Sequence, residues 1–126
     1  YSVAKKNNKK LTAAVFPYPE MADHMVRQRW DKWNIDEVYP MIYHGFYNEE
    51  VDWIGYATKQ GVGDVEAENI ALNTGVYIPD FKSSEELKQA ILLAKENGAK
   101  GITFYDGPTL TAAYLQTIKE TKEGLK

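Results

Sequence analysis

The alternation of apolar runs with helix-forming segments constrains the fold more than any other feature of this chain. Strands that alternate with helices pair in parallel through right-handed crossovers. Nearly continuous apolar runs are typical of strands that are covered on both faces. The sequence therefore predicts an α/β fold of four βα units with a parallel sheet. We expect the strands at residues 11–16, 37–43, 69–78 and 101–105 and the helices at 21–34, 49–60, 84–97 and 110–118.

The units repeat about every 30 residues, which is the spacing of a (β/α)₈ or TIM barrel. Such a barrel takes about 250 residues, and this chain has 126. Residues 1–9 read as the end of a helix whose strand would lie upstream. We therefore expect residues 1–126 to be a single domain, the C-terminal half of a barrel within a longer chain. The alternative is a small flavodoxin-like α/β domain, but the loop at 17–20 lacks the glycine-rich pattern of a nucleotide site.

Several local signals add detail to this plan. Two tryptophans continue a helical stripe that begins at Met21, so we expect Trp30 and Trp33 to be buried between helix and sheet. Gly61 is expected to end the second helix. Gly75, inside the third strand, is typical of a bulge or a close backbone approach. Ser83 or Ser84 is a good N-cap for the third helix.

Composition excludes several classes of function. The net charge is −3, with mixed signs and no basic stripe, so we expect no nucleic-acid partner. No apolar run is long enough to span a membrane. With no cysteine, disulfides, zinc–thiolate sites and thiol nucleophiles are excluded. His24 and His44 are too far apart to form a metal motif, and we expect no metal and no cofactor.

Three carboxylates follow the expected strands, at the barrel face where active sites form. They are Glu20, Asp80 and Asp106, and we name them as candidate catalytic groups. Each also has an ordinary interpretation as a helix-capping or first-turn residue. Asp36 and Glu37 enter a strand at the opposite face.

Aromatic residues make up 13% of the chain and gather at the same strand ends. Such rings fill cores, but at strand ends they can also stack on a ligand. His44 has the additional capacity to donate to a sugar hydroxyl or to adjust a nearby carboxyl group. The candidate substrate-binding residues are Tyr18, Tyr43, His44, Phe46, Tyr47, Tyr77 and Tyr105.

One segment carries a family resemblance. Gln28, Trp30, Trp33, Asp36, Pro40, Met41 and Tyr43 match the "QDW..W....vD...PM.Y" pattern of glycoside-hydrolase-like TIM barrels, the family 10-like glycosyl hydrolases. Gly75 with Tyr77, and Gly98 with Gly101 and Phe104, match two later strands of that family. Arg27 and Arg29 depart from the Gly and Asp that are usual there. The resemblance implies a barrel fold, a carbohydrate ligand and, because many members are exported bacterial lipoproteins, an extracytoplasmic location.

These observations give three hypotheses for function. The first is O-glycosidic bond hydrolysis by two carboxylates, completed by a missing N-terminal half, so that these residues alone are inactive. The second is a non-catalytic carbohydrate-binding or structural domain, and the third is a small α/β domain that binds a protein partner. An open half-barrel exposes sheet edges, so we also expect self-association, most simply as a dimer.

Overall fold

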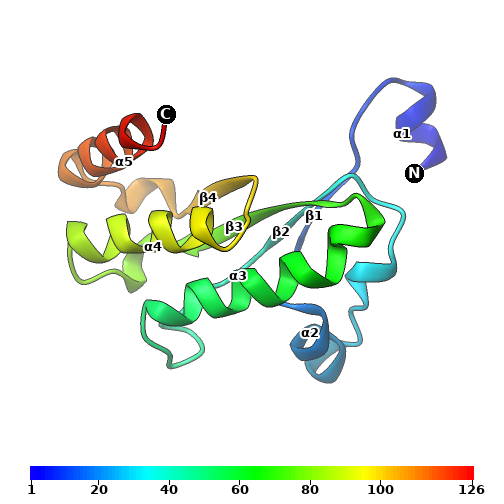
Figure 1. Ribbon diagram of the computed structural model, residues 1–126, viewed down its shortest axis with the longest axis horizontal. Coiled ribbons are helices and arrows are strands. Elements are labelled where there is room, and N and C mark those ends of the chain that lie inside the picture. The colour runs from blue at the N-terminus through cyan, green and yellow to red at the C-terminus, as the bar shows by residue number, and fades with distance from the viewer.

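The computed structural model describes residues 1–126 and contains one four-stranded, all-parallel sheet (Figure 1). The strands are β1 (Thr12–Val15), β2 (Glu37–Pro40), β3 (Ala71–Tyr77) and β4 (Gly101–Tyr105). The helices are α1 (Ser2–Lys6), α2 (Pro19–Val26), α3 (Asp52–Val65), α4 (Ser84–Glu96) and α5 (Ala112–Gly124). Short 3₁₀ turns cover Trp30–Lys32, Glu66–Glu68, Ile78–Asp80 and Gly107–Thr109. The predicted α/β fold of four βα units is confirmed.

The strands lie in sequential order, β1-β2-β3-β4. A doubly wound sheet reverses its strand order at a switch point, and this sheet has no reversal. Right-handed crossovers between sequential parallel strands put the connecting helices on one face of the sheet. Accordingly, α3 packs against α4 and α4 packs against α5 (Figure 1). The arrangement is that of consecutive units of a (β/α)₈ barrel and favours this interpretation over a flavodoxin-like domain.

The core lies between the sheet and these helices. Alternate strand residues such as Val38, Leu72 and Val76 are buried against them. At the middle of the layer, the hydroxyls of Thr58 in α3 and Thr74 in β3 lie 2.8 Å apart in a buried hydrogen bond. The intervening residues, including Asn73 and Thr103, are half-buried and face the other side. The sheet therefore has one face that is largely buried, except at β4, and one partly covered face, rather than the two covered faces expected from sequence.

The first predicted helix is shorter than its apolar stripe suggested. It ends at Val26 because Arg27 adopts a left-handed conformation with φ of 60°. The following segment then returns to the end of β1, where Gln28 accepts from the Phe16 amide (3.1 Å) and the Trp30 indole donates to the Phe16 carbonyl (3.1 Å). Trp30 is fully buried as predicted, but Trp33 is 41% exposed, so its predicted burial is wrong.

Two boundary predictions around α3 were also wrong. The helix continues to Val65, and Gly61 lies buried within it, where a Cβ atom would come 2.7 Å from Leu72 Cδ1. Gly61 is therefore needed for close helix–sheet packing, not for termination. Strand β2 ends at Pro40 rather than Tyr43, since only Met41 continues the ladder, as a bridge to Gly75. The predicted Ser83 cap is confirmed, because its hydroxyl accepts from the Glu86 amide at 3.2 Å.

None of the helices combines the length and the hydropathy that a bilayer crossing requires.

Candidate functional site

A groove lies beyond the C-terminal ends of β1, β2 and β3. Its volume is about 520 Å³. We call it the aromatic groove, because five of its eight lining residues are Phe or Tyr. The segments after three neighbouring strands supply the lining, as in the sites of parallel α/β folds. The lining residues are Phe16, Met41, Tyr43, Gly45, Phe46, Tyr47, Tyr77 and Asp80.

Three tyrosines form a layer at this edge of the sheet. Tyr77 and Tyr105 are register partners at the ends of β3 and β4. The Tyr43 ring lies 5.3 Å from the Tyr77 ring and 5.5 Å from the Tyr105 ring, between centroids. Burial, followed by the proximity of the Tyr105 and Tyr77 phenols, raises the pKa of Tyr43 to about 12. The Tyr43 hydroxyl is therefore neutral at physiological pH and acts as a hydrogen-bonding group, not as a base.

Gly75 makes room for this layer. A Cβ atom at Gly75 would lie 2.9 Å from Cε2 of Tyr105 and 2.7 Å from the Pro40 carbonyl oxygen. Such distances are closer than real carbon contacts allow, so any side chain here would displace the Tyr105 ring or the end of β2. The predicted close approach at Gly75 is confirmed.

Asp80 holds together the loop after β2 and the turn after β3, which both line the groove. Its Oδ2 accepts from the Gly45 amide at 2.9 Å. A Cβ atom at Gly45 would lie 2.5 Å from Asp80 Oδ1, so only glycine admits the carboxylate this closely. The contact fixes the loop after β2 against the turn after β3 and leaves the carboxylate at the groove wall.

A second aromatic series extends from the groove towards α3. Phe46 is 74% exposed, and its ring lies 5.0 Å from Tyr47. The Tyr47 ring lies 5.2 Å from Trp53. Sequence reasoning missed Trp53. The available signal was its position in the first turn of α3, adjacent to the buried Ile54 but outside the apolar stripe of that helix.

His44 lies behind the groove and not in its lining. Its side chain is buried, with the ring 5.1 Å from the Phe81 ring, and its Nδ1 has no hydrogen-bond partner. The chain turns at residues 44–48, and within this turn the His44 ring packs on Phe81 while Tyr43 and Gly45 line the groove.

Of the three candidate carboxylates, only Asp80 lines the aromatic groove. Glu20 is exposed in the first turn of α2 and lines a different, polar pocket with Asp23, Arg29 and Asp64. Asp106 adopts a left-handed conformation (φ 70°), and its carbonyl accepts from the Thr109 hydroxyl at 2.7 Å. The structure therefore does not bring the three carboxylates into one pocket.

Tyr18 also lies away from the groove. Its ring makes an edge contact with Tyr56 of α3, with centroids 6.0 Å apart. Burial, then the nearby Tyr56 phenol, raises the pKa of Tyr18. Tyr18 therefore anchors the start of α2 on α3. No group of three or more His, Asp or Glu side chains is placed to hold a metal ion.

Neither a model of a known protein family nor a curated protein matches this sequence.

Proposed function

We propose that the aromatic groove binds a carbohydrate. The observation that carries the proposal is the convergence of exposed and half-buried aromatic rings, including Phe46, Tyr47 and Tyr77, around a single carboxylate, Asp80. Sugar rings present apolar C–H faces that stack on aromatic rings, and they present hydroxyls that donate to a carboxylate. A mostly aromatic wall with a few polar groups is the usual composition of a small-molecule site.

The size of the groove agrees with this ligand class. Its volume of about 520 Å³ lies within the usual range for small-molecule sites, which is roughly 300–1,000 Å³. The groove is open to solvent along Phe46, so an oligosaccharide can extend beyond it. The neutral Tyr43 hydroxyl adds a donor and acceptor at the strand ends.

Glycoside hydrolysis is the second candidate, and the carboxylate of Asp80 in the groove favours it. Hydrolysis requires two carboxyl groups, roughly 5–5.5 Å apart for retention or 6.5–9.5 Å apart for inversion. No second carboxylate of this chain lines the groove. Hydrolysis is therefore a proposal for a longer protein in which another segment contributes the partner, and the 126 residues alone are expected to release no reducing sugar.

Calorimetric titration with neutral hexasaccharides, both α- and β-linked, tests the binding proposal. The double variant Phe46→Ala/Tyr47→Ala should lower the affinity for the bound sugar at least tenfold, or about 1.4 kcal/mol. Tyr1→Ala is the matched control, because Tyr1 is an exposed aromatic residue at the start of the chain and outside the groove. The affinity of this variant for the sugar should be unchanged. Failure of the whole panel to bind, or equal loss in both variants, would contradict the proposal.

A further inference from the structure

The aromatic groove contains one carboxylate with an oxygen that is free to meet a ligand. Its eight lining residues include one acidic side chain, Asp80, and no basic one. Oδ2 of Asp80 accepts from the Gly45 amide at 2.9 Å, and Asp80 takes part in none of the ion pairs of the structure. Oδ1 is therefore available to a ligand group that carries a positive charge.

The lysine nearest in sequence does not neutralise this carboxylate. Lys82 follows Asp80 by two residues, but its ammonium lies 3.9 Å from a carboxylate oxygen of Glu50. Both side chains of that pair are largely exposed, so it is a weak surface contact. The charge of Asp80 is not compensated by an ion pair with Lys82, and it can attract a cation into the groove.

The strand ends around the groove have the same sign of charge. The segments that follow the four strands, at residues 16–18, 41–51, 78–83 and 106–111, contain four carboxylates and one lysine. The carboxylates are Glu49, Glu50, Asp80 and Asp106, and the lysine is Lys82. Because the carboxyl ends of parallel strands meet at one edge of a sheet, a ligand that approaches the groove encounters a negative potential.

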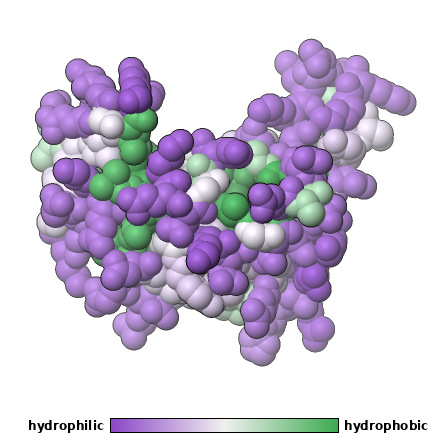
Figure 2. All heavy atoms as spheres, viewed as in Figure 1, coloured by the Kyte–Doolittle hydropathy of each residue, from purple (hydrophilic) through white to green (hydrophobic).

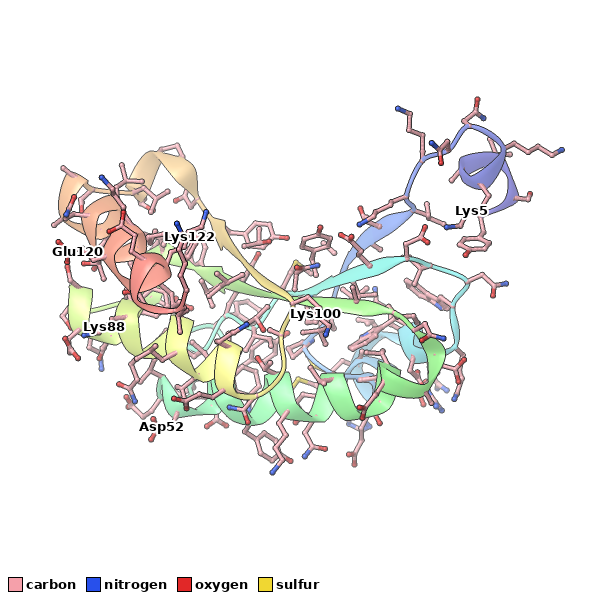
Figure 3. All side chains as sticks on the ribbon, turned by 45° about the horizontal axis from the view of Figure 1, so that its top comes forward. Lys5, Asp52, Lys88, Lys100, Glu120 and Lys122 are labelled. Atoms are coloured by element: carbon pink, nitrogen blue, oxygen red, sulfur yellow. The ribbon has the colours of Figure 1, made fainter.

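A second groove of similar size has the opposite charge. Its volume is about 580 Å³, and it lies between α4, β4 and α5. Figure 2 shows the apolar strip where α5 meets α4, and Figure 3 shows Lys100 directly before β4 and Lys122 in the last turn of α5. The charged residues that line this groove are Lys95, Lys100, Lys122 and Lys126. A cationic ligand is repelled there and attracted to the aromatic groove.

The aromatic rings add to this preference. The face of a Phe or Tyr ring attracts a cation that lies within about 6 Å of the ring centre. The planes of Phe46 and Tyr47 stand at 80° to each other, and those of Tyr43 and Tyr77 at 33°. Rings at different angles can contact a ligand from more than one side. A carboxylate surrounded by such rings is a combination that suits an ammonium group.

We propose that the aromatic groove prefers a carbohydrate that carries free amino groups, such as an oligomer of glucosamine, over one that carries only hydroxyls. The inference rests on the proposed carbohydrate binding and adds the source of its specificity. The ammonium group forms a charge-assisted hydrogen bond with Asp80, and the apolar face of the sugar ring stacks on Phe46 and Tyr47. An acidic sugar would meet a like charge and bind weakly.

Three β-1,4-linked hexasaccharides that differ only at the second carbon of each sugar test this preference. The hexamer of glucosamine carries an ammonium group there, that of N-acetylglucosamine an acetamide, and that of glucose a hydroxyl. Calorimetric titration at mildly acidic pH, where the amines are protonated, should show the glucosamine hexamer bound at least tenfold more tightly than either neutral hexamer. Raising the salt concentration should narrow this difference, because salt screens the attraction between charges.

Asp80→Asn removes the charge and keeps an oxygen acceptor for the Gly45 amide. With the fold verified by circular dichroism, this variant should bind the glucosamine hexamer at least tenfold more weakly than the original chain does. Asp64→Asn is the matched control, since Asp64 lies on α3 in the polar pocket that also holds Glu20 and Asp23, outside the groove. It should bind the glucosamine hexamer as the original chain does, which distinguishes the groove from the acidic pocket.

Hexalysine separates the recognition of an amino sugar from simple charge attraction. It carries a similar charge without sugar rings, and it should bind at least tenfold more weakly than the glucosamine hexamer. Equal affinity for the glucosamine and glucose hexamers, a preference retained in Asp80→Asn, or hexalysine bound as tightly as the sugar would overturn the inference.

The same titrations distinguish failure of this inference from failure of carbohydrate binding itself. If all three hexamers bind equally and Phe46→Ala/Tyr47→Ala weakens them all, the groove binds sugars without a preference for amines, and only the present inference is wrong. If none of the three binds, both proposals are contradicted.

Discussion

The Asp80 carboxylate accepts a hydrogen bond from the Gly45 amide at 2.9 Å, and this contact couples the loops after β2 and β3. Both partners line the aromatic groove together with Tyr43, Phe46 and Tyr77. The same side chain thus has a structural role in holding the loops and a position from which its other oxygen can reach a ligand.

Replacing Asp80 tests the structural role directly. Asp80→Ala removes the acceptor and should lower the free energy of unfolding by about 1 kcal/mol, whereas Asp80→Asn keeps an oxygen acceptor and should cost less. Hydrogen exchange at the Gly45 amide should accelerate in the alanine variant. Unchanged exchange in Asp80→Ala would show that the contact does not hold the loop.

Gly75→Ala should destabilise the protein by about 1–3 kcal/mol, since the new methyl group overlaps the Pro40 carbonyl and the Tyr105 ring. Urea denaturation measures the effect. Gly63→Ala is the matched control, because nothing lies within 4 Å of its added Cβ and alanine favours the helix. The control should be neutral or slightly stabilising. Equal effects of the two substitutions would contradict the packing around Gly75.

The buried Thr58–Thr74 pair is suited to a double-mutant cycle. Thr58→Val leaves the Thr74 hydroxyl buried without its partner and should cost about 1–3 kcal/mol, as should Thr74→Val. The double valine variant removes both polar groups and should be nearly as stable as the original chain. Simple additivity of the two single losses would be inconsistent with this hydrogen bond.

The raised pKa of Tyr43 predicts a loss of stability at high pH. In the unfolded chain a tyrosine ionises near pH 10, but in the folded chain the pKa of Tyr43 is about 12. Between these values the unfolded state releases a proton that the folded state retains, so the free energy of unfolding falls as pH rises through this window. Tyr43→Phe should remove this part of the fall and should also remove the last tyrosine step from an ultraviolet titration. Simultaneous ionisation of all tyrosines near pH 10 would contradict the burial of Tyr43.

The existence and order of the strands could be predicted because each is a short apolar run bounded by turn residues. The ends of the helices could not be predicted in the same way, because tertiary contacts determine where they stop. Helix α2 stops just before Gln28 and Trp30, whose side chains hydrogen-bond to the backbone of Phe16. Trp30 and Phe16 are 14 residues apart in the sequence, so the local pattern does not reveal this contact. Likewise, Gly61 looked like a stop signal, yet it lies inside α3, where an added Cβ atom would press on the side chains of Leu72 and Trp30.

The sequence predicted where the candidate site lies, but not every residue that belongs to it. Tyr43, Phe46, Tyr47, Tyr77 and Asp80 line the groove, as strand-end residues of adjacent parallel strands should. His44 does not, because it begins the turn at residues 44–48, which buries its ring against Phe81. Trp53 joins the aromatic series from α3, and only the packing of the loop onto that helix brings it to Tyr47.

Amide chemical-shift mapping of the ¹⁵N-labelled chain during titration with the best-bound hexasaccharide tests the central claim most directly. The account predicts shifts concentrated in residues 43–47 and 77–80, with the turn at Gly107–Thr109 and helix α5 unaffected. Absence of shifts with every sugar, or shifts centred on another surface of the molecule, would contradict carbohydrate binding in the aromatic groove.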